Sequence, residues 1–243
     1  MAYSGRNLWR YPAKQLNFAA LTFCACYVMN LASRFSALLC AFLLLLTAPT
    51  LQATKRPKFS KKDQLVTIST SLGDIKLILF DATPKHKANF LKLAESGFYN
   101  GTTFHRVIPN FMIQGGDANS KDSDPDNDGM GQPDAATIPA EIRPEFKHKF
   151  GALAAARQGD FVNPDRASSA SQFYLVQNHQ GTSHLDGQYT VYGQVISGLD
   201  VLDKIATQPK NERDRPLTDI KMTMKVEKLK KKKITELYGY QYQ

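Results

Sequence analysis

The sequence has little cysteine, and none of it lies where a folded domain would use it. The three cysteines, Cys24, Cys26 and Cys40, all fall within the first 40 of 243 residues. A disulfide framework for the rest of the chain is therefore excluded. The sequence also lacks a G-x-S-x-G elbow and a cluster with metal-ligand spacing, so we expect neither that serine chemistry nor a metal site.

Acidic residues are absent from the first 53 positions, although the chain as a whole carries a formal charge of +9. Much of the remaining positive charge lies near the C-terminus, at Lys228 and in the run from Lys230 to Lys233. A basic run can attract nucleic acid or anionic lipid. No aromatic stacking platform or nucleic-acid motif accompanies this one, so we expect a solvated tail and no nucleic-acid partner.

The N-terminal region has the pattern of an export signal. Residues 37–48 form a 12-residue apolar core between Arg34 and Pro49, with Ala53 as a cleavage position. We therefore interpret residues 1–53 as a signal peptide region in which translation starts at Met29. The alternative is an uncleaved membrane anchor that combines this core with a second apolar stretch at residues 18–28.

After a basic linker over residues 54–64, the sequence shows many short strand patterns and only two helix patterns. The first helix should follow Thr83, with Pro84 in its first turn, and end at Gly97; the second should cover residues 199–206. Strands are expected at residues 65–70, 75–80, 102–107, 111–114, 152–156, 172–177, 189–195 and 220–226. This set favours an antiparallel barrel or sandwich over an alternating parallel sheet.

One apolar run, T-T-F-H-R-V-I-P-N-F-M-I-Q-G-G-D, carries an arginine among its hydrophobic residues. Because a buried, unpaired charge is heavily penalised, Arg106 must either meet a carboxylate or stand where a fixed positive donor is needed. Alternation places Met112 and Gln114 on one strand face and Phe111 and Ile113 on the other. The face with Met112 and Gln114 is interpreted as a binding face. The alternative is that the strand belongs to the core and that the single glutamine is hydrogen-bonded within the protein.

Four segments carry a resemblance to a known family. They are F-Y-N-G-T-T-F-H-R-V-I-P-N-F-M-I-Q-G-G-D (98–117), G-A-L-A-A-A-R (151–157), S-Q-F-Y-L-V (171–176) and H-L-D-G-Q-Y-T-V-Y-G-Q-V (184–195). In this order and spacing they resemble the cyclophilin-type peptidyl-prolyl cis/trans isomerases, bacterial members most of all. The resemblance implies a mainly β domain over residues 65–229, built as a closed eight-stranded antiparallel barrel capped by two α-helices. Residues 230–243 would then form a basic, aromatic tail.

The resemblance also implies the roles of individual residues. Arg106 matches the catalytic arginine, and Gln114 matches a glutamine that holds the substrate backbone. Three residues match the pocket that receives the proline ring: Phe111, Met112 and Leu185. Seven more match other substrate-binding positions: His105, Ala156, Arg157, Gln172, Tyr174, His184 and Tyr189. Four residues depart from common family choices: Arg157 replaces Asn, Tyr174 replaces Phe, His184 replaces Trp and Tyr189 replaces His. These departures bear on substrate preference and leave the arginine unchanged.

The function implied is that of an exported isomerase, located in the periplasm, that accelerates the folding of exported proteins. It would act as a monomer on proline-containing polypeptides and would need neither a cofactor nor a metal. It would contact a membrane only through an uncleaved N-terminal segment. The alternative functions are a non-catalytic proline-binding or chaperone-like module in the cell envelope, and a membrane-tethered assembly factor that docks through its tail.

One acidic loop resembles a metal-binding motif. Asp124, Asp126 and Asp128, followed by Gly129, look like the opening of a calcium loop. The twelfth position is Ala135 instead of a glutamate, so we expect a solvated acidic turn. Three histidines outside the family segments lie in polar stretches and are expected at the surface: His86, His148 and His179.

Overall fold

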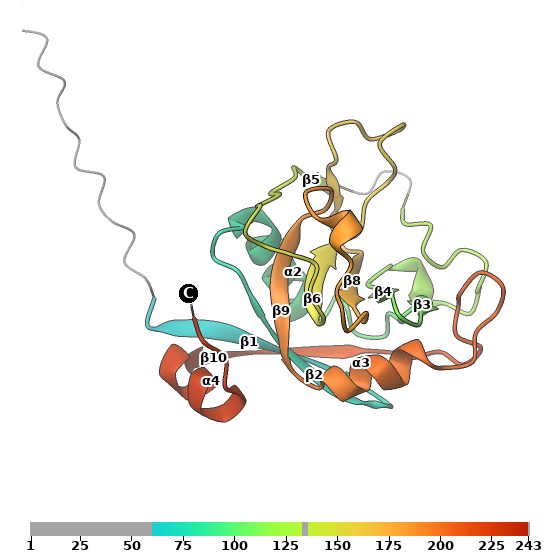
Figure 1. Ribbon diagram of the computed structural model, residues 1–243. Coiled ribbons are helices and arrows are strands. Elements are labelled where there is room, and N and C mark those ends of the chain that lie inside the picture. The colour runs from blue at the N-terminus through green and yellow to red at the C-terminus, as the bar shows by residue number, and fades with distance from the viewer. Residues whose placement is uncertain (1–59, 133–135, 243) are drawn as a thin grey trace, which may run out of the picture. The chain divides into compact units, whose positions relative to one another are not determined.

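The computed structural model of the chain describes residues 60–132 and 136–242. Its main sheet contains β1 (Lys62–Thr70), β2 (Gly73–Leu79), β3 (Arg106–Ile108), β4 (Met112–Gly115), β6 (Ala152–Ala155), β8 (Phe173–Val176), β9 (Val191–Ser197) and β10 (Thr223–Lys230). The other elements are α2 (Pro84–Glu95), α3 (Leu199–Ala206), α4 (Lys231–Tyr238), the short strands β5 (Thr137–Ile138) and β7 (Ser168–Ser169), and the 3-10 turns η1 (Asn119–Lys121) and η2 (Ser183–Leu185) (Figure 1). The predicted signal peptide, the start at Met29 and the first part of the linker lie outside the described residues.

The eight strands of the main sheet are ordered β10-β1-β2-β9-β6-β8-β4-β3, and every neighbouring pair is antiparallel. The expected mainly β architecture is therefore confirmed. Between the two outer strands, β10 and β3, the described residues form no ladder. An isolated bridge between Thr103 and Lys221 links the segments that precede them. Closure of the sheet into a barrel stays a prediction.

The predicted helices match the structure closely, and the strand predicted at residues 102–107 is the main difference. Only its last residues belong to β3, because residues 101–104 bond to the segment before β10 instead. The backbone N–H of Phe104 donates to the Ile220 carbonyl (3.1 Å), and that of Met222 donates to the Thr102 carbonyl (2.9 Å). The chain thus changes partners within one apolar run, which alternation of side chains cannot reveal.

The C-terminal residues form a helix that the sequence patterns did not predict. Helix α4 follows β10 directly, at the end of the domain where β1 begins (Figure 1). Its fully buried Ile234 packs on Leu65 and Ile78, which lie directly opposite each other on β1 and β2. Tyr238, Tyr240 and Tyr242 join the same cluster. The domain boundaries predicted after residues 64 and 229 therefore fall inside one folded unit, since the apolar outer face of the β1–β2 hairpin requires a cover.

Hydrophobic residues in β1 show why this cover is needed. Leu65, Val66 and Ile68 are all buried, although successive side chains of a strand point to opposite faces. Val66 and Ile68 enter the main core, whereas Leu65 faces α4. A strand that is apolar on both faces must be covered on both faces. In the part of the chain that the structure describes, no helix has the length and hydropathy needed to cross a membrane.

Candidate active site

A row of side chains crosses three neighbouring strands on one face of the sheet. Arg106 on β3 lies directly opposite Gln114 on β4, and Gln114 lies opposite Tyr174 on β8. Directly opposed residues share a face, so these three side chains stand side by side. Val107 and Ile113 point to the other face and are fully buried in the main core. The apolar residues between the polar ones thus fix the direction in which Arg106 and Gln114 point.

A pocket of about 140 Å³ opens on this face. It is lined by Arg106, Phe111, Met112, Gln114, Ala156, Arg157, Tyr174, Leu185 and Tyr189. Sites for drug-sized ligands usually enclose roughly 300–1,000 Å³, so this pocket suits a single small side chain. Nine of the twelve predicted site residues therefore meet around one hollow, which has room for a compact ring.

Phe111 lies on the same side as Met112, which differs from the alternation expected from the sequence. Strand β4 begins only at Met112, and Phe111 belongs to the preceding turn. In that turn Asn110 has a left-handed φ of 59° and donates its backbone N–H to the Gln177 side chain (2.6 Å). The turn rotates Phe111 out of the strand pattern and into the pocket wall.

The guanidinium of Arg106 stands at the edge of the pocket, and its side chain is 44% exposed. Its Nε lies 3.8 Å from one carboxylate oxygen of Asp214. The other oxygen of Asp214 accepts a hydrogen bond from Lys210 (2.6 Å). No acceptor among the described residues lies within hydrogen-bond distance of the Arg106 guanidinium. Asp214 thus holds the positive charge in place from a distance, while the donors of Arg106 remain open to a ligand.

Comparison with known proteins identifies the family of this chain. The family model described as cyclophilin type peptidyl-prolyl cis-trans isomerase/CLD matches residues 65–226. The chain belongs to this family. A peptidyl-prolyl cis-trans isomerase of Arabidopsis thaliana is 41% identical to the cyclophilin domain over 161 residues, which cover 65% of this chain and 91% of the relative. A peptidyl-prolyl cis-trans isomerase-like 2 protein of Rhizopus delemar is 40% identical over 166 residues, covering 67% of this chain and 28% of that longer protein.

A solved structure supports the same assignment. The cyclophilin type peptidyl-prolyl cis-trans isomerase of Cryptosporidium parvum, crystallised in the presence of the dipeptide Ala-Pro, has 30% sequence identity and a TM-score of 0.57. The match covers 67% of this chain and 98% of that one. The mainly β, cyclophilin-like fold is therefore confirmed, and the enzyme class of the domain is peptidyl-prolyl cis/trans isomerase.

Three pocket residues form a row of contacts in the pocket wall of this cyclophilin, with Tyr189 between Arg157 and Tyr174. The guanidinium carbon of Arg157 lies 4.4 Å from the ring centroid of Tyr189, and the rings of Tyr189 and Tyr174 pack edge to face at 5.9 Å. Arg157 is nearly buried and is held by Asp160 (2.6 Å) and by the Gln188 carbonyl (3.0 Å). Its charge is therefore engaged within the protein, and its flat face supports the Tyr189 ring.

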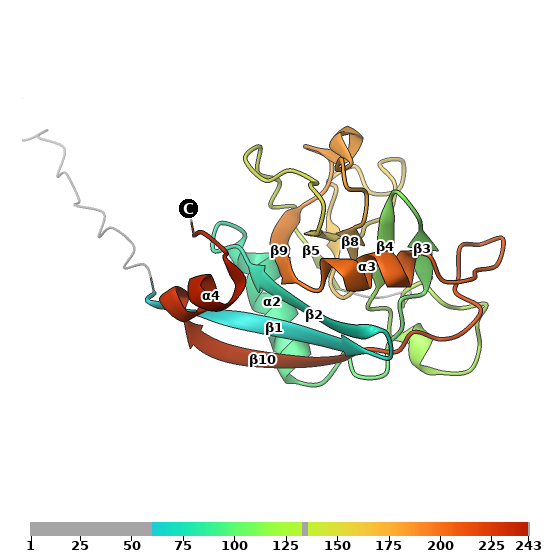
Figure 2. The same ribbon diagram turned by 60° about the horizontal axis from the view of Figure 1, so that its bottom comes forward.

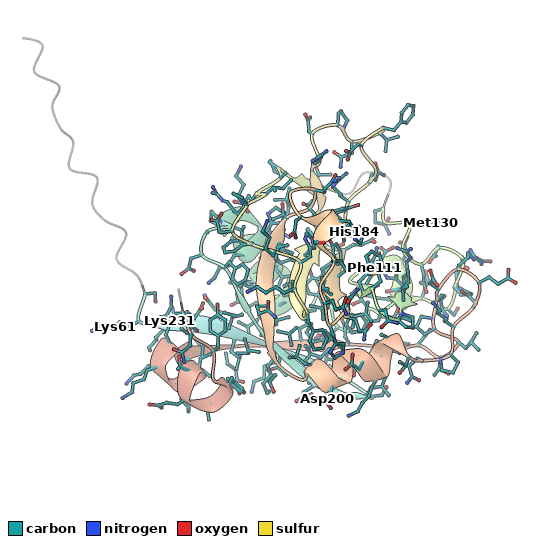
Figure 3. The ribbon with its side chains drawn as sticks, in the orientation of Figure 1. Lys61, Phe111, Met130, His184, Asp200 and Lys231 are labelled. Atoms are coloured by element: carbon teal, nitrogen blue, oxygen red, sulfur yellow. The ribbon has the colours of Figure 1, made fainter. Side chains whose placement is uncertain are left out.

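The other three predicted residues lie beside the pocket rather than in its lining. Gln172 accepts a hydrogen bond from the Gln114 amide (3.0 Å), and the exposed ring of His184 stacks on Phe111 at 5.9 Å (Figure 3). His105 is buried, and its two ring nitrogens have no hydrogen-bond partner. Burial lowers the pKa of His105 to about 4. Contact of these three with substrate stays a prediction.

The surface positions expected for His86 and His148 are wrong, since both are buried; His179 is exposed as expected. Each of the three pairs with a carboxylate, His86 with Glu141 (2.7 Å), His148 with Asp186 (2.9 Å) and His179 with Asp203 (3.0 Å). Local sequence patterns do not reveal these pairs, because the partners are 24 to 55 residues apart. Asp186 does, however, directly follow the pocket residue Leu185.

The acidic loop is tied to the protein by arginines. Asp128 accepts a hydrogen bond from Arg215 (2.6 Å), and Asp126 forms an ion pair with Arg213. Within residues 60–132 and 136–242 no group of three or more His, Cys, Asp or Glu side chains is arranged to hold a metal ion. The expected solvated turn is wrong for Asp128, whose side chain is only 4% exposed. Both carboxylates serve as ion-pair partners of the neighbouring loop.

Proposed function

We propose that this cyclophilin domain accelerates Xaa-Pro isomerisation in exported polypeptides, with Arg106 stabilising the transition state. One observation carries the proposal: an open guanidinium stands at the edge of a small pocket whose walls include Phe111, Met112 and Leu185. In this proposal the apolar walls receive the proline ring, and the charge at the pocket edge faces the prolyl amide nitrogen.

The barrier to isomerisation explains why a charged donor is useful. Rotation about the prolyl amide sacrifices resonance and costs about 20 kcal/mol, so the unaided reaction takes tens to hundreds of seconds. In the twisted state the prolyl nitrogen regains a lone pair. A guanidinium that donates to this nitrogen stabilises the twisted state more than the planar ground state, which lowers the barrier.

The remaining groups would hold the substrate without taking part in bond making. The amide nitrogen of Gln114 donates to Gln172, and no described residue donates to its amide oxygen, which can therefore accept a substrate N–H. Rotation breaks no covalent bond and moves no electrons to another group. The proposed reaction therefore needs no cofactor and no metal.

The scaffold in this proposal is a closed eight-stranded barrel. Its support is the bridge between Thr103 and Lys221, together with the flanking backbone hydrogen bonds between residues 101–104 and 220–222. Closure would hold the strand that carries Arg106 from both sides, and so fix the guanidinium relative to the pocket.

The proposed location is the periplasm, and the proposed substrates are proline-containing proteins that fold after export. Support comes from the sequence, in which a 12-residue apolar core follows Arg34 and precedes Ala53. We propose a monomer without a nucleic-acid partner, attached to a membrane only if the N-terminal segment is not cleaved. Intact-mass measurement of the exported protein tests this, since a chain that begins far from Thr54 contradicts cleavage.

The activity is tested by NMR exchange spectroscopy on a short Xaa-Pro peptide with a protein of residues 54–243. We expect cis and trans signals to exchange far faster than in the free peptide, at catalytic protein concentration. The alternative function, a non-catalytic proline-binding or chaperone-like module, predicts peptide binding with an unchanged exchange rate. Binding without acceleration would therefore reject the isomerase proposal in favour of that module.

A further inference from the structure

A chain of hydrogen bonds runs from a surface carboxylate to the pocket wall. An oxygen of Asp186 accepts a hydrogen bond from the backbone N–H of His148 (2.9 Å) and contacts its ring Nδ1 (2.9 Å). The other ring nitrogen, Nε2, lies 3.0 Å from the hydroxyl of Tyr174, which lines the pocket. The side chain of His148 is completely buried, so its two nitrogens have these two partners only.

The direction of each hydrogen bond follows from the partners. A carboxylate only accepts, so Nδ1 of His148 carries the proton and donates to Asp186. Nε2 then bears a lone pair and accepts the hydroxyl proton of Tyr174. Tyr174 thus points its only donor away from the pocket and presents its ring to it. The wall that Tyr174 presents to the pocket is therefore apolar, although the residue carries a hydroxyl.

We propose that His148 and Asp186 are positioning residues for the proline pocket, which act through Tyr174 and favour proline binding only while His148 is neutral. The proposal rests on the proposed function, because it assigns the pocket to a proline ring. It adds two features to the proposed function: the His148–Asp186 pair supports Tyr174 from behind the pocket wall, and substrate affinity depends on pH.

Protonation of His148 would reverse the outer hydrogen bond. Nε2 would then donate to the Tyr174 oxygen, and the hydroxyl proton of Tyr174 would need another acceptor. No described side chain other than His148 lies within hydrogen-bond distance of that hydroxyl. The proton would therefore turn toward the pocket, where an unpaired polar group opposes the seating of an apolar ring.

Burial, together with the charged and titratable groups around it, favours the neutral form of His148 at pH 7. Burial lowers the pKa of His148, the hydrogen bond and negative charge of Asp186 offset this only in part, and His184 and Lys147 lower it further. Burial opposes ionisation of Asp186, but its hydrogen bonds from His148 hold its pKa below the usual value, with Lys147 at 3.7 Å. Burial also raises the pKa of Tyr174 well above its usual value, and Arg157 only partly counters it. Tyr189 packs edge to face on His148, with 6.4 Å between the ring centroids.

The other two histidine–carboxylate pairs provide matched controls. His179 pairs with Asp203 and stacks on Phe150, and neither partner lines the pocket. The buried His86 pairs with Glu141, and its Nε2 has no hydrogen-bond partner. Only His148 extends its second nitrogen to a pocket residue.

The test is the affinity of the full-length protein for an Ala-Pro-containing peptide, measured between pH 7.5 and 5.0 with a parallel NMR titration of the His148 ring. We expect Kd to rise by about fivefold over this range, with circular dichroism unchanged. Because linkage is reciprocal, saturating peptide should lower the pKa of His148. An affinity that does not change with pH, or a His148 pKa that peptide leaves unmoved, would overturn the proposal.

Substitutions separate this role from a structural one. His148→Gln cannot take up a proton, so it should flatten the pH dependence of KM while kcat changes little; His179→Gln should retain the wild-type slope. If His148→Gln lowers only the melting temperature and keeps the wild-type slope, the residue is structural and the proposal is wrong. Failure of any Xaa-Pro peptide to bind at pH 7.5 would reject the proposed substrate as well, whereas pH-independent binding rejects the polar support alone.

Discussion

The two ends of the cyclophilin domain are built in different ways. Figure 2 shows β3 and β4, which carry the pocket row, at one end and α4 beside β1 and β10 at the other. Around the pocket, polar side chains from distant parts of the chain satisfy one another, as His148 does with Asp186 and Gln114 with Gln172. At the α4 end, Ile234 seals an apolar pair of neighbouring strands.

This difference indicates that the two ends have different roles, one in ligand binding and the other in stability. The open guanidinium and the small hollow at the pocket end leave groups available for a ligand. The α4 end buries apolar side chains around Ile234. Its charged groups pair with one another, because Lys87 meets Asp63 and Asp81, and Asp81 also meets Lys231. Substitutions at the two ends should therefore separate catalysis from stability.

Arg106→Ala should have the largest effect on activity. We expect kcat/KM to fall by roughly 100-fold, about 3 kcal/mol of lost transition-state stabilisation, because the donor to the twisted amide is removed. Arg106→Lys should restore little, since a flexible point charge does not reproduce an oriented guanidinium. NMR exchange rates on an Xaa-Pro peptide, with peptide affinity measured in parallel, check both variants.

The control for this prediction is thermal unfolding of the same variants. The 3.8 Å contact with Asp214 is long and partly exposed, so the melting temperature should change little. If Arg106→Ala unfolds at a much lower temperature while turnover of the folded protein stays normal, Arg106 is a structural ion-pair partner. Wild-type turnover in a well-folded variant would end the mechanism proposed for this residue.

Ile234→Ala should show the opposite pattern at the α4 end. Removing three carbons from a fully buried isoleucine should lower the free energy of unfolding by about 2 to 3 kcal/mol. The pocket lies elsewhere, so kcat/KM at a temperature where the protein is folded should be unchanged. Urea denaturation and the isomerase assay on the same preparation check this.

A matched substitution sharpens the test. Leu237 lies on the same helix and is 56% exposed, so Leu237→Ala should cost much less than Ile234→Ala. Equal costs would mean that the helix does not dock as described. A loss of activity in Ile234→Ala would show that the two ends are coupled.

Acid should destabilise the protein through His105, which lies beside the pocket. The pKa of His105 is about 4, against an ordinary value near 6.5, so folding disfavours its charged form. Stability is therefore lost as the pH falls below 6.5, and His105 alone should contribute a loss of about 2 kcal/mol between pH 7 and 5. Urea denaturation at both pH values should show this loss in the wild type and a smaller one in His105→Phe.

The α4 end supplies the comparison for this third prediction. Ile234 packs on Leu65 and Ile78, and the carboxylate partners of His86, His148 and His179 lie outside α4. The cost of Ile234→Ala should therefore be the same at pH 5 and pH 7, because distant sites add independently. A cost that changes with pH would contradict the independence of the two ends.

Prediction from sequence succeeded where the relevant residues are close together in the chain. Arg106 and Gln114 could be placed from one continuous run, because a strand pattern and a resemblance both rest on local order. Phe111, which the resemblance assigned to the proline pocket, lines the hollow, whereas alternation placed it on the wrong face. The turn at Asn110 removes it from the strand, and alternation holds only within a strand.

Sequence prediction failed for groups whose partners are distant. His148 was expected at the surface because its neighbours in the chain are polar, yet Asp186 and Tyr174 bury it. The basic C-terminal run was expected to be a solvated tail, yet Ile234 of α4 is buried in a cluster with Leu65 on β1 and Ile78 on β2, and Tyr238 packs against the same cluster. Local polarity cannot report burial against a distant segment.

The sequence by itself determined the mainly β class, the two predicted helices and the family. Periodicity and motif order depend only on the order of residues along the chain. Tertiary structure alone decided which polar groups pair, since this depends on strands brought together by the order β6-β8-β4-β3. It also decided that α4 seals the Leu65–Ile78 pair, because burial is a property of the assembled surface and not of any one segment.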